Sequence, residues 1–294
     1  MKTKNISLLA KLALFMAAII WGSSFIIVKN TVDVLPPNML LAIRFFLACI
    51  LLSVIYHKRL RLINKDYLVS GAIIGFFLFI AYCSQTIGIT NTTPGKNAFL
   101  TAIYCVVVPF LYWFVNHTRP DRYNFLAALL CFAGIGFVSL TQNLTIGTGD
   151  LLTLLGGFFF AIHMVAVAKL TQGRDAILLT ILQFGFSAIF SLFVTLIFET
   201  APKISDIQAG SIIGILYLVC FATAATLLLQ NVGQKYTPPS SASLILSLES
   251  VFGVLFSVLF FGDKLTVRLV IGFILIFISI VVSETKLSFL KKKG

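Results

Sequence analysis

The stretch LLAKLALFMAAIIWGSSFIIV, residues 8–28, decides the fold class of this chain. A helix needs roughly 20 mainly apolar residues to cross a hydrocarbon core about 30 Å thick, because every backbone amide there must bond within its own segment. Lysines precede the run as in a signal peptide, but no A-x-A-like cleavage site follows it. We therefore predict a first transmembrane helix that is retained.

Further apolar runs of similar length follow along the whole chain, and their connections are too short for a soluble domain. The composition agrees, with 59% hydrophobic and 11% charged residues, where soluble domains have about 45–50% and about 25%. The sequence predicts an all-α membrane protein of ten transmembrane helices. The predicted spans are residues 8–28, 36–56, 67–88, 94–115, 123–140, 151–169, 177–198, 210–232, 239–261 and 267–283.

The net charge of +12 could indicate nucleic-acid binding. The basic residues form short clusters between apolar runs, which is typical of membrane-flanking charge, so we expect no nucleic-acid partner. The five cysteines lie inside apolar runs without a CxxC pair, and H-E-x-x-H is absent. We expect no metal and no cofactor.

The same charges predict the orientation of the chain. With a cytoplasmic N-terminus, 16 of the 22 Lys and Arg residues fall on the inside, five fall outside, and Arg44 lies within a span. Cytoplasmic loops carry the excess of Lys and Arg. We therefore expect a multi-pass protein of a bacterial cytoplasmic membrane with both termini in the cytoplasm.

The chain contains an internal repeat. The stretch LLAIRFFLA around Arg44 aligns with LTILQFGFSA around Gln183 at an offset of 139, and QTIG from Gln85 aligns with QNVG from Gln230 at an offset of 145. Five spans in each half invert the second half relative to the first. We predict two inverted repeats, residues 1–142 and 143–294, with a solute site near the membrane midplane between them, as in many secondary transporters.

Four motifs resemble the EamA-type members of the drug/metabolite transporter superfamily. They are AAIIWGSSF, AFLTAIYCVVVP, GDLLTLLGGFFFAIH and the long run QKYTPPSSASLILSLESVFGVLFSVLFFGDKLT. The resemblance covers essentially the whole chain and implies two five-helix repeats and transport of a small metabolite. Members often have E-P where this chain has Glu249-Ser250, and G-E where it has Gly262-Asp263.

Two charged residues lie far from the ends of the predicted spans. A charge at that depth costs at least ~2.5 kcal/mol on insertion scales, so it usually faces a cavity or a partner. Arg44 carries a planar fork suited to a carboxylate or phosphate, whereas Glu249 could exchange a proton or bind a cationic group. Alternatively, Arg44 forms an ion pair, meets the carbonyl groups of a helix end or reaches the membrane surface, and a protonated or paired Glu249 holds its helix to the neighbouring ones. An ion pair between Arg44 and Glu249 would satisfy both residues, and they would then serve packing alone.

Polar and aromatic side chains complete the candidate solute site. His163 could relay a proton, and Gln85, Gln183 and Gln230 are related by the repeat. Each could instead hold helices together through hydrogen bonds.

Trp21 and Tyr104 could stack on a solute, although aromatic residues in membrane helices mostly serve packing. Pro109, in the middle of a predicted span, removes a backbone hydrogen bond and is our gating candidate.

These features favour a secondary transporter that exports or exchanges small metabolites such as amino acids or related solutes by alternating access. Its partners would be the solute, the lipid bilayer, and protons or a counter-solute, with monomer and homodimer both open. The alternatives are an intramembrane enzyme and a passive pore. An acyl-transfer elbow G-x-S-x-G and a Walker motif are both absent, so we expect neither an enzyme nor a nucleotide-driven pump.

Overall fold

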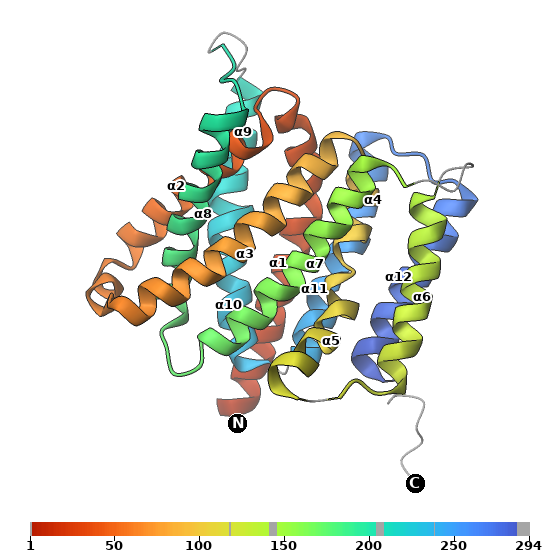
Figure 1. Ribbon diagram of the computed structural model, residues 1–294, viewed down its shortest axis with the longest axis horizontal. Helices are drawn as coiled ribbons and strands as arrows, with labels where there is room; N and C mark the ends of the chain where they lie inside the picture. Colours follow the sequence, from red (N-terminus) through yellow and green to blue (C-terminus); the bar gives the residue numbers. More distant parts are fainter. Residues whose placement is uncertain (1, 118, 141–145, 204–208, 238, 287–294) are drawn as a thin grey trace.

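The computed structural model describes residues 2–117, 119–140, 146–203, 209–237 and 239–286. Within these ranges the protein is helical, apart from turns and one isolated bridge between Leu140 and Ile146. The long helices lie side by side in one bundle (Figure 1). Helix α1 begins and α12 ends at the same end of this bundle, which we call the termini end; the other is the opposite end.

The helices of the two halves of the chain follow one another with short connections. The first half contains α1 (Lys2–Val32), α2 (Pro37–Ile55), the 3-10 helix η1 (His57–Leu62), α3 (Lys65–Thr90), α4 (Pro94–Thr101), α5 (Tyr104–Asn116) and α6 (Arg122–Ser139). The second contains α7 (Thr148–Leu170), α8 (Ala176–Phe198), α9 (Ala209–Tyr217), the π-helix η3 (Leu218–Ala225), α10 (Thr226–Tyr236), α11 (Pro239–Phe256), the π-helix η4 (Ser257–Phe261) and α12 (Val267–Thr285).

Eight helical stretches of the described chain are long and apolar enough to cross a membrane. Two more apolar helices, Ile245–Phe261 and Val267–Ser283, are shorter and coincide with the last two predicted spans. The prediction of an all-α membrane protein is confirmed, while eight of the ten predicted spans reach full length. The eight stretches are Leu8–Val32, Pro37–Ile55, Lys65–Thr90, Pro94–Val115, Arg122–Ser139, Thr148–Leu170, Ala176–Phe198 and Ala209–Tyr236.

The outer surface of the bundle is apolar. Phe132, Leu196, Phe198 and Phe260 each expose more than 70% of their surface. Side chains of this size are buried in a water-soluble protein, so this surface belongs against lipid.

Side chains cap several of the helices. Asp121 forms a capping box at the start of α6, and Asp175 caps α8. The carboxylate of Glu199, just after α8, accepts hydrogen bonds from the backbone amides of Asn38 and Met39 at 2.8 Å each. Glu199 thereby caps α2 and joins it to α8.

Close packing in the bundle depends on glycine. A Cβ atom at Gly22 of α1 would lie 2.4 Å from the Cβ atom of Phe252 in α11. A side chain at this position would therefore force α1 and α11 apart.

The predicted span 94–115 is not one continuous helix. It is interrupted at Ala102 and Ile103, between α4 and α5. Gly157 of α7 packs against this interruption, where an added Cβ atom would lie 2.8 Å from the Thr101 carbonyl oxygen. The interruption precedes Pro109, which we predicted as the bend and which lies inside α5.

Candidate functional site

A small cavity of about 50 Å³ lies near the middle of the bundle, and we call it the central cavity. By volume it holds only a few water molecules. Helices α1 and α3 each line it with one face, at spacings i, i+3, i+4 and i+7, as expected of an α-helix. The lining residues are Trp21, Ser24, Phe25, Val28, Arg44, Tyr82, Gln85, Thr86, Ile89, Asn97, Thr101, Tyr104, Phe160, His163, Met164, Leu227, Gln230 and Glu249.

Seven of the eight predicted solute residues line the central cavity: Trp21, Arg44, Gln85, Tyr104, His163, Gln230 and Glu249. Gln183 does not line it, and Pro109 lines a second cavity at the termini end. The fold thus brings together residues from seven helices, although their roles stay a prediction.

Arg44 is 1% exposed and lies in α2. Its Nε and Nη2 atoms donate hydrogen bonds to Thr223 Oγ1 at 3.2 and 3.1 Å, and its guanidinium lies 5.3 Å from the centre of the Tyr82 ring. None of the ion pairs between described residues includes Arg44 or Glu249. Arg44 therefore neither reaches the surface nor pairs with Glu249, and its described contacts are the Thr223 hydroxyl and the side chain of Tyr82.

Glu249 is 5% exposed, in the middle of α11. Its carboxyl group lines the same cavity as Tyr104 of α5. Tyr82, which lies against the Arg44 guanidinium, is part of the same lining. The cavity therefore presents one basic and one acidic group that do not form an ion pair with each other.

His163 and Gln183 form a buried pair, with exposures of 1% and 0%. The Nε2 atom of His163 lies 3.0 Å from Gln183 Oε1, so Nε2 carries the proton and donates. Gln183 lies outside the cavity lining and fixes the orientation of the imidazole ring. The Nδ1 atom of His163 is left as a hydrogen-bond acceptor.

Gln85 belongs to a chain of polar contacts on the side of the opposite end. Its Nε2 atom donates to Thr101 Oγ1 at 2.9 Å, and its backbone carbonyl accepts from Asn97 Nδ2 at 3.2 Å. Asn97 Nδ2 also donates to Thr153 Oγ1 at 2.7 Å. Gln85 therefore links α3 to α4 and, through Asn97, to α7. Both uses that we foresaw, cavity lining and helix cohesion, occur together in this residue.

The π-helix η3 supplies two contacts that the sequence did not indicate. Its wider turn presents the Thr223 hydroxyl to Arg44, and its Ala222 carbonyl accepts a hydrogen bond from Trp21 Nε1 at 3.0 Å. Isolated π-helical turns often occur at functional sites. Tyr82 was also missed, although it lies three residues before Gln85 on the same face of α3 and could have been found from that spacing.

A larger cavity of about 900 Å³ lies at the termini end, and we call it the vestibule. Its size is that of a small-molecule pocket. Among the described residues, its lining contains four basic side chains and no acidic one. The lining comes from α5, α6, α7, α10 and α12 and their connections at this end (Figure 1). The lining residues are Val108, Pro109, Tyr112, Arg119, Pro120, Asn124, Met164, Val167, Ala168, Thr171, Gln172, Gly173, Arg174, Asn231, Gln234, Lys235, Ser283 and Lys286.

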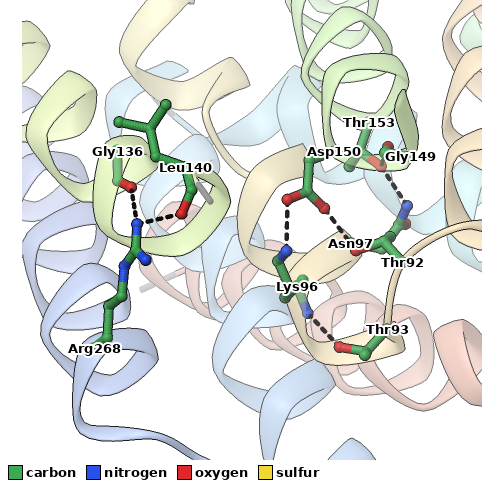
Figure 2. A network of polar contacts seen from close by, with 10 residues as sticks. All are labelled: Thr92, Thr93, Lys96, Asn97, Gly136, Leu140, Gly149, Asp150, Thr153 and Arg268. Carbon is green, nitrogen blue, oxygen red and sulfur yellow. Dashed lines mark hydrogen bonds and ion pairs between the residues drawn. The ribbon is translucent and has the colours of Figure 1, made fainter. Parts of the chain in front are cut away.

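The opposite end is held together by polar contacts, which Figure 2 shows. Lys96 Nζ of α4 lies 2.5 Å from Asp150 Oδ2 of α7, and the side chains are 22% and 4% exposed. Thr92 Oγ1 donates to the other oxygen of Asp150 at 2.6 Å. Beside this pair, Arg268 of α12 donates to two carbonyl groups at the end of α6. A mostly buried ion pair therefore joins the two halves of the chain at this end.

Known protein families and curated proteins resemble this chain over nearly its whole length. The model of the EamA-like transporter family matches residues 8–140 and again residues 147–285. A protein from Archaeoglobus fulgidus named Uncharacterized transporter is 33% identical over 279 residues, which is 94% of this chain and 85% of that protein. YoaV of Bacillus subtilis, also named Uncharacterized transporter, is 21% identical over 90% of this chain and 93% of its own.

The fold also resembles a solved crystal structure. The two share 16% sequence identity at a TM-score of 0.69, over 96% of this chain and 99% of the other. At this identity the likeness concerns the fold alone.

Proposed function

The chain belongs to the EamA-like transporter family, and on that premise we propose that it is a secondary transporter that exports or exchanges small metabolites, such as amino acids or related solutes, by alternating access. One observation carries the proposal. The central cavity contains a buried arginine and a buried glutamate that do not neutralise each other. Such groups are costly inside a membrane unless they meet a ligand.

Alternating access in this family implies two inverted five-helix repeats, residues 1–142 and 143–294. The two segments that match the family model support that division. So does the cavity, because the offsets of 139 and 145 between the halves pair twelve of its lining residues with one another. These pairs are Trp21 and Phe160, Ser24 and His163, Phe25 and Met164, Tyr82 and Leu227, Gln85 and Gln230, and Tyr104 and Glu249.

Helix packing supports the same relation. Helix α3 packs along α7. The counterpart of α3 in the second half is α10, and the counterpart of α7 in the first half is α1; these two helices also pack together. Helices α2 and α8 pair with each other, as do α6 and α12. Each pairing is retained when the two halves are exchanged, as we expect of two repeats related by a twofold axis.

The cavity chemistry suits a zwitterion. The guanidinium of Arg44 can bind a carboxylate through two parallel hydrogen bonds, and Glu249 can accept a hydrogen bond from an ammonium group. Trp21, Tyr82 and Phe160 offer aromatic surface to an apolar side chain. At about 50 Å³ the cavity is smaller than such a solute, so the helices must move apart to admit it.

The two ends of the bundle differ as expected of a transporter in a conformation that is open on one side. The vestibule of about 900 Å³ lies at the termini end, while the ion pair of Lys96 and Asp150 closes the opposite end. We assign the termini end to the cytoplasm of a bacterial cell membrane, because most of the basic residues flank it. Proton exchange at Glu249 or a counter-solute would supply the coupling.

Counterflow in proteoliposomes tests this function. Liposomes with purified protein, loaded with an unlabelled amino acid, should accumulate the same labelled amino acid; glutamate, alanine, leucine and phenylalanine are suitable. Glu249→Gln and Arg44→Ala should each lower the initial rate at least about tenfold, since each removes one of the two groups that hold the solute.

Two exposed charges provide matched controls. Asp33→Asn and Lys264→Ala change a charge of the same sign at exposed positions and should retain the wild-type rate. Unaltered counterflow in both cavity variants would reject the site. If none of the amino acids shows counterflow but overexpressing cells release another metabolite, the proposed solute class is rejected and the proposed transport function is retained.

A further inference from the structure

The central cavity and the vestibule share one lining residue among those that the structure describes. Met164 of α7 is the residue common to the two linings. It is 8% exposed and belongs to the hydrophobic cluster that also contains Tyr104 and Leu246. Its side chain is therefore packed in the hydrophobic interior and borders both cavities.

The neighbouring residues on α7 and α10 fix this position along the path. On α7, His163 lines the central cavity and Val167 lines the vestibule. On α10, Gln230 lines the central cavity and Asn231 lines the vestibule. The boundary thus crosses both helices at one level, and Met164 lies at that level.

We propose that Met164 is the constriction through which the solute passes between the central cavity and the vestibule, and that the size of its side chain sets the largest solute that can pass. The inference rests on the proposed transport function. Methionine suits this position because three rotatable bonds let an unbranched side chain swing aside without breaking a hydrogen bond. At the offset of 139 its counterpart is Phe25, a stiffer side chain that lines the cavity toward the opposite end.

A thiol behind the constriction tests the proposal without any solute. Ser24 lines the central cavity but not the vestibule, and Ser24→Cys changes little in volume. In detergent at low temperature, iodoacetamide should alkylate this thiol slowly while Met164 is present. Addition of Met164→Ala should raise the alkylation rate at least about tenfold, measured at that site by mass spectrometry.

Val167→Ala in the same Ser24→Cys background is the matched control, because it shortens a buried side chain that lines the vestibule alone. It should leave the alkylation rate unchanged within about twofold. Equal acceleration by both truncations, no acceleration by Met164→Ala, or rapid alkylation with Met164 in place would each overturn the proposal. Equal elution on size exclusion and equal melting temperatures establish that the variants fold alike.

A second measurement concerns solute size. In counterflow, Met164→Phe should lower the rate for phenylalanine relative to alanine, and Met164→Ala should raise that ratio. An unchanged ratio in both variants would overturn the role of Met164 in size selection. If no amino acid is transported at all, the proposed solute class fails, while the alkylation test still decides whether Met164 separates the two cavities.

Discussion

The ion pair between Lys96 and Asp150 should set how often the opposite end opens. Asp150→Asn keeps the shape of the side chain and an acceptor for Thr92, but removes the charge that holds Lys96 at 2.5 Å. A hydrogen bond between charged groups contributes about 1.5–3 kcal/mol. Lys96 is 22% exposed, which favours the lower part of that range. Because 1.4 kcal/mol is a factor of ten, the ratio of open to closed should rise about 10- to 30-fold.

Alkylation of a second cavity thiol measures this ratio. Val28 lines the central cavity toward the opposite end, so the Val28→Cys thiol should react faster with iodoacetamide in proportion to the open population. Asp33→Asn, an exposed carboxylate at the same end, is the control and should change nothing. The charge-swapped pair Lys96→Asp with Asp150→Lys should restore the slow rate. A rise below about twofold in Asp150→Asn, or an equal rise in Asp33→Asn, would refute the role of this pair as a closure.

Three further changes follow from particular contacts. Arg44→Lys keeps the charge but loses the fork that donates twice to Thr223, so counterflow should fall at least about fivefold rather than be conserved. Gly22→Leu must separate α1 from α11 and should destabilise the protein by at least about 1–3 kcal/mol, seen as a lower melting temperature in detergent. Partial burial alone would raise the pKa of Asp121, but the bonds from Lys286 and from backbone amides outweigh it and lower that pKa. Asp121 therefore stabilises the fold above its unfolded-state pKa, and this contribution is lost as the pH falls through the folded value. Lys286→Ala should move that acid-side loss to higher pH in a series of thermal melts.

Membrane insertion made much of the fold predictable from the sequence. The cost of a charge in hydrocarbon limits such residues to places where they are needed, so Arg44 and Glu249 stood out, and both line the central cavity. Apolar length predicted the spans, because the bilayer fixes the length of a helix. The offsets of the repeat related Gln85 to Gln230, and both line the same cavity.

Other parts of the site depend on packing that no local pattern encodes. The interruption at Ala102 and Ile103 lies where Gly157 of a distant segment packs closely against the chain. The π-helical turn that presents Thr223 to Arg44 has no signature in its sequence of small and apolar residues. Pro109, which we chose as the gating candidate because proline disrupts helices, lies inside α5 and lines the vestibule; it does not lie at the interruption.

The alignment of the two halves also bears on the different contacts at the two ends of the bundle. At the offset of 139 the counterpart of Asp150 is Lys11, an exposed residue of α1, so the ion pair of the opposite end has no equivalent at the termini end. There, Met164 is the described residue that lines both cavities and that we propose as the constriction. Breaking a charged hydrogen bond costs more than turning a thioether. Without solute, the conformer open toward the termini end should therefore be the more stable one. Export against a gradient would then have to draw the free energy for opening the opposite end from the bound solute or from the coupled ion.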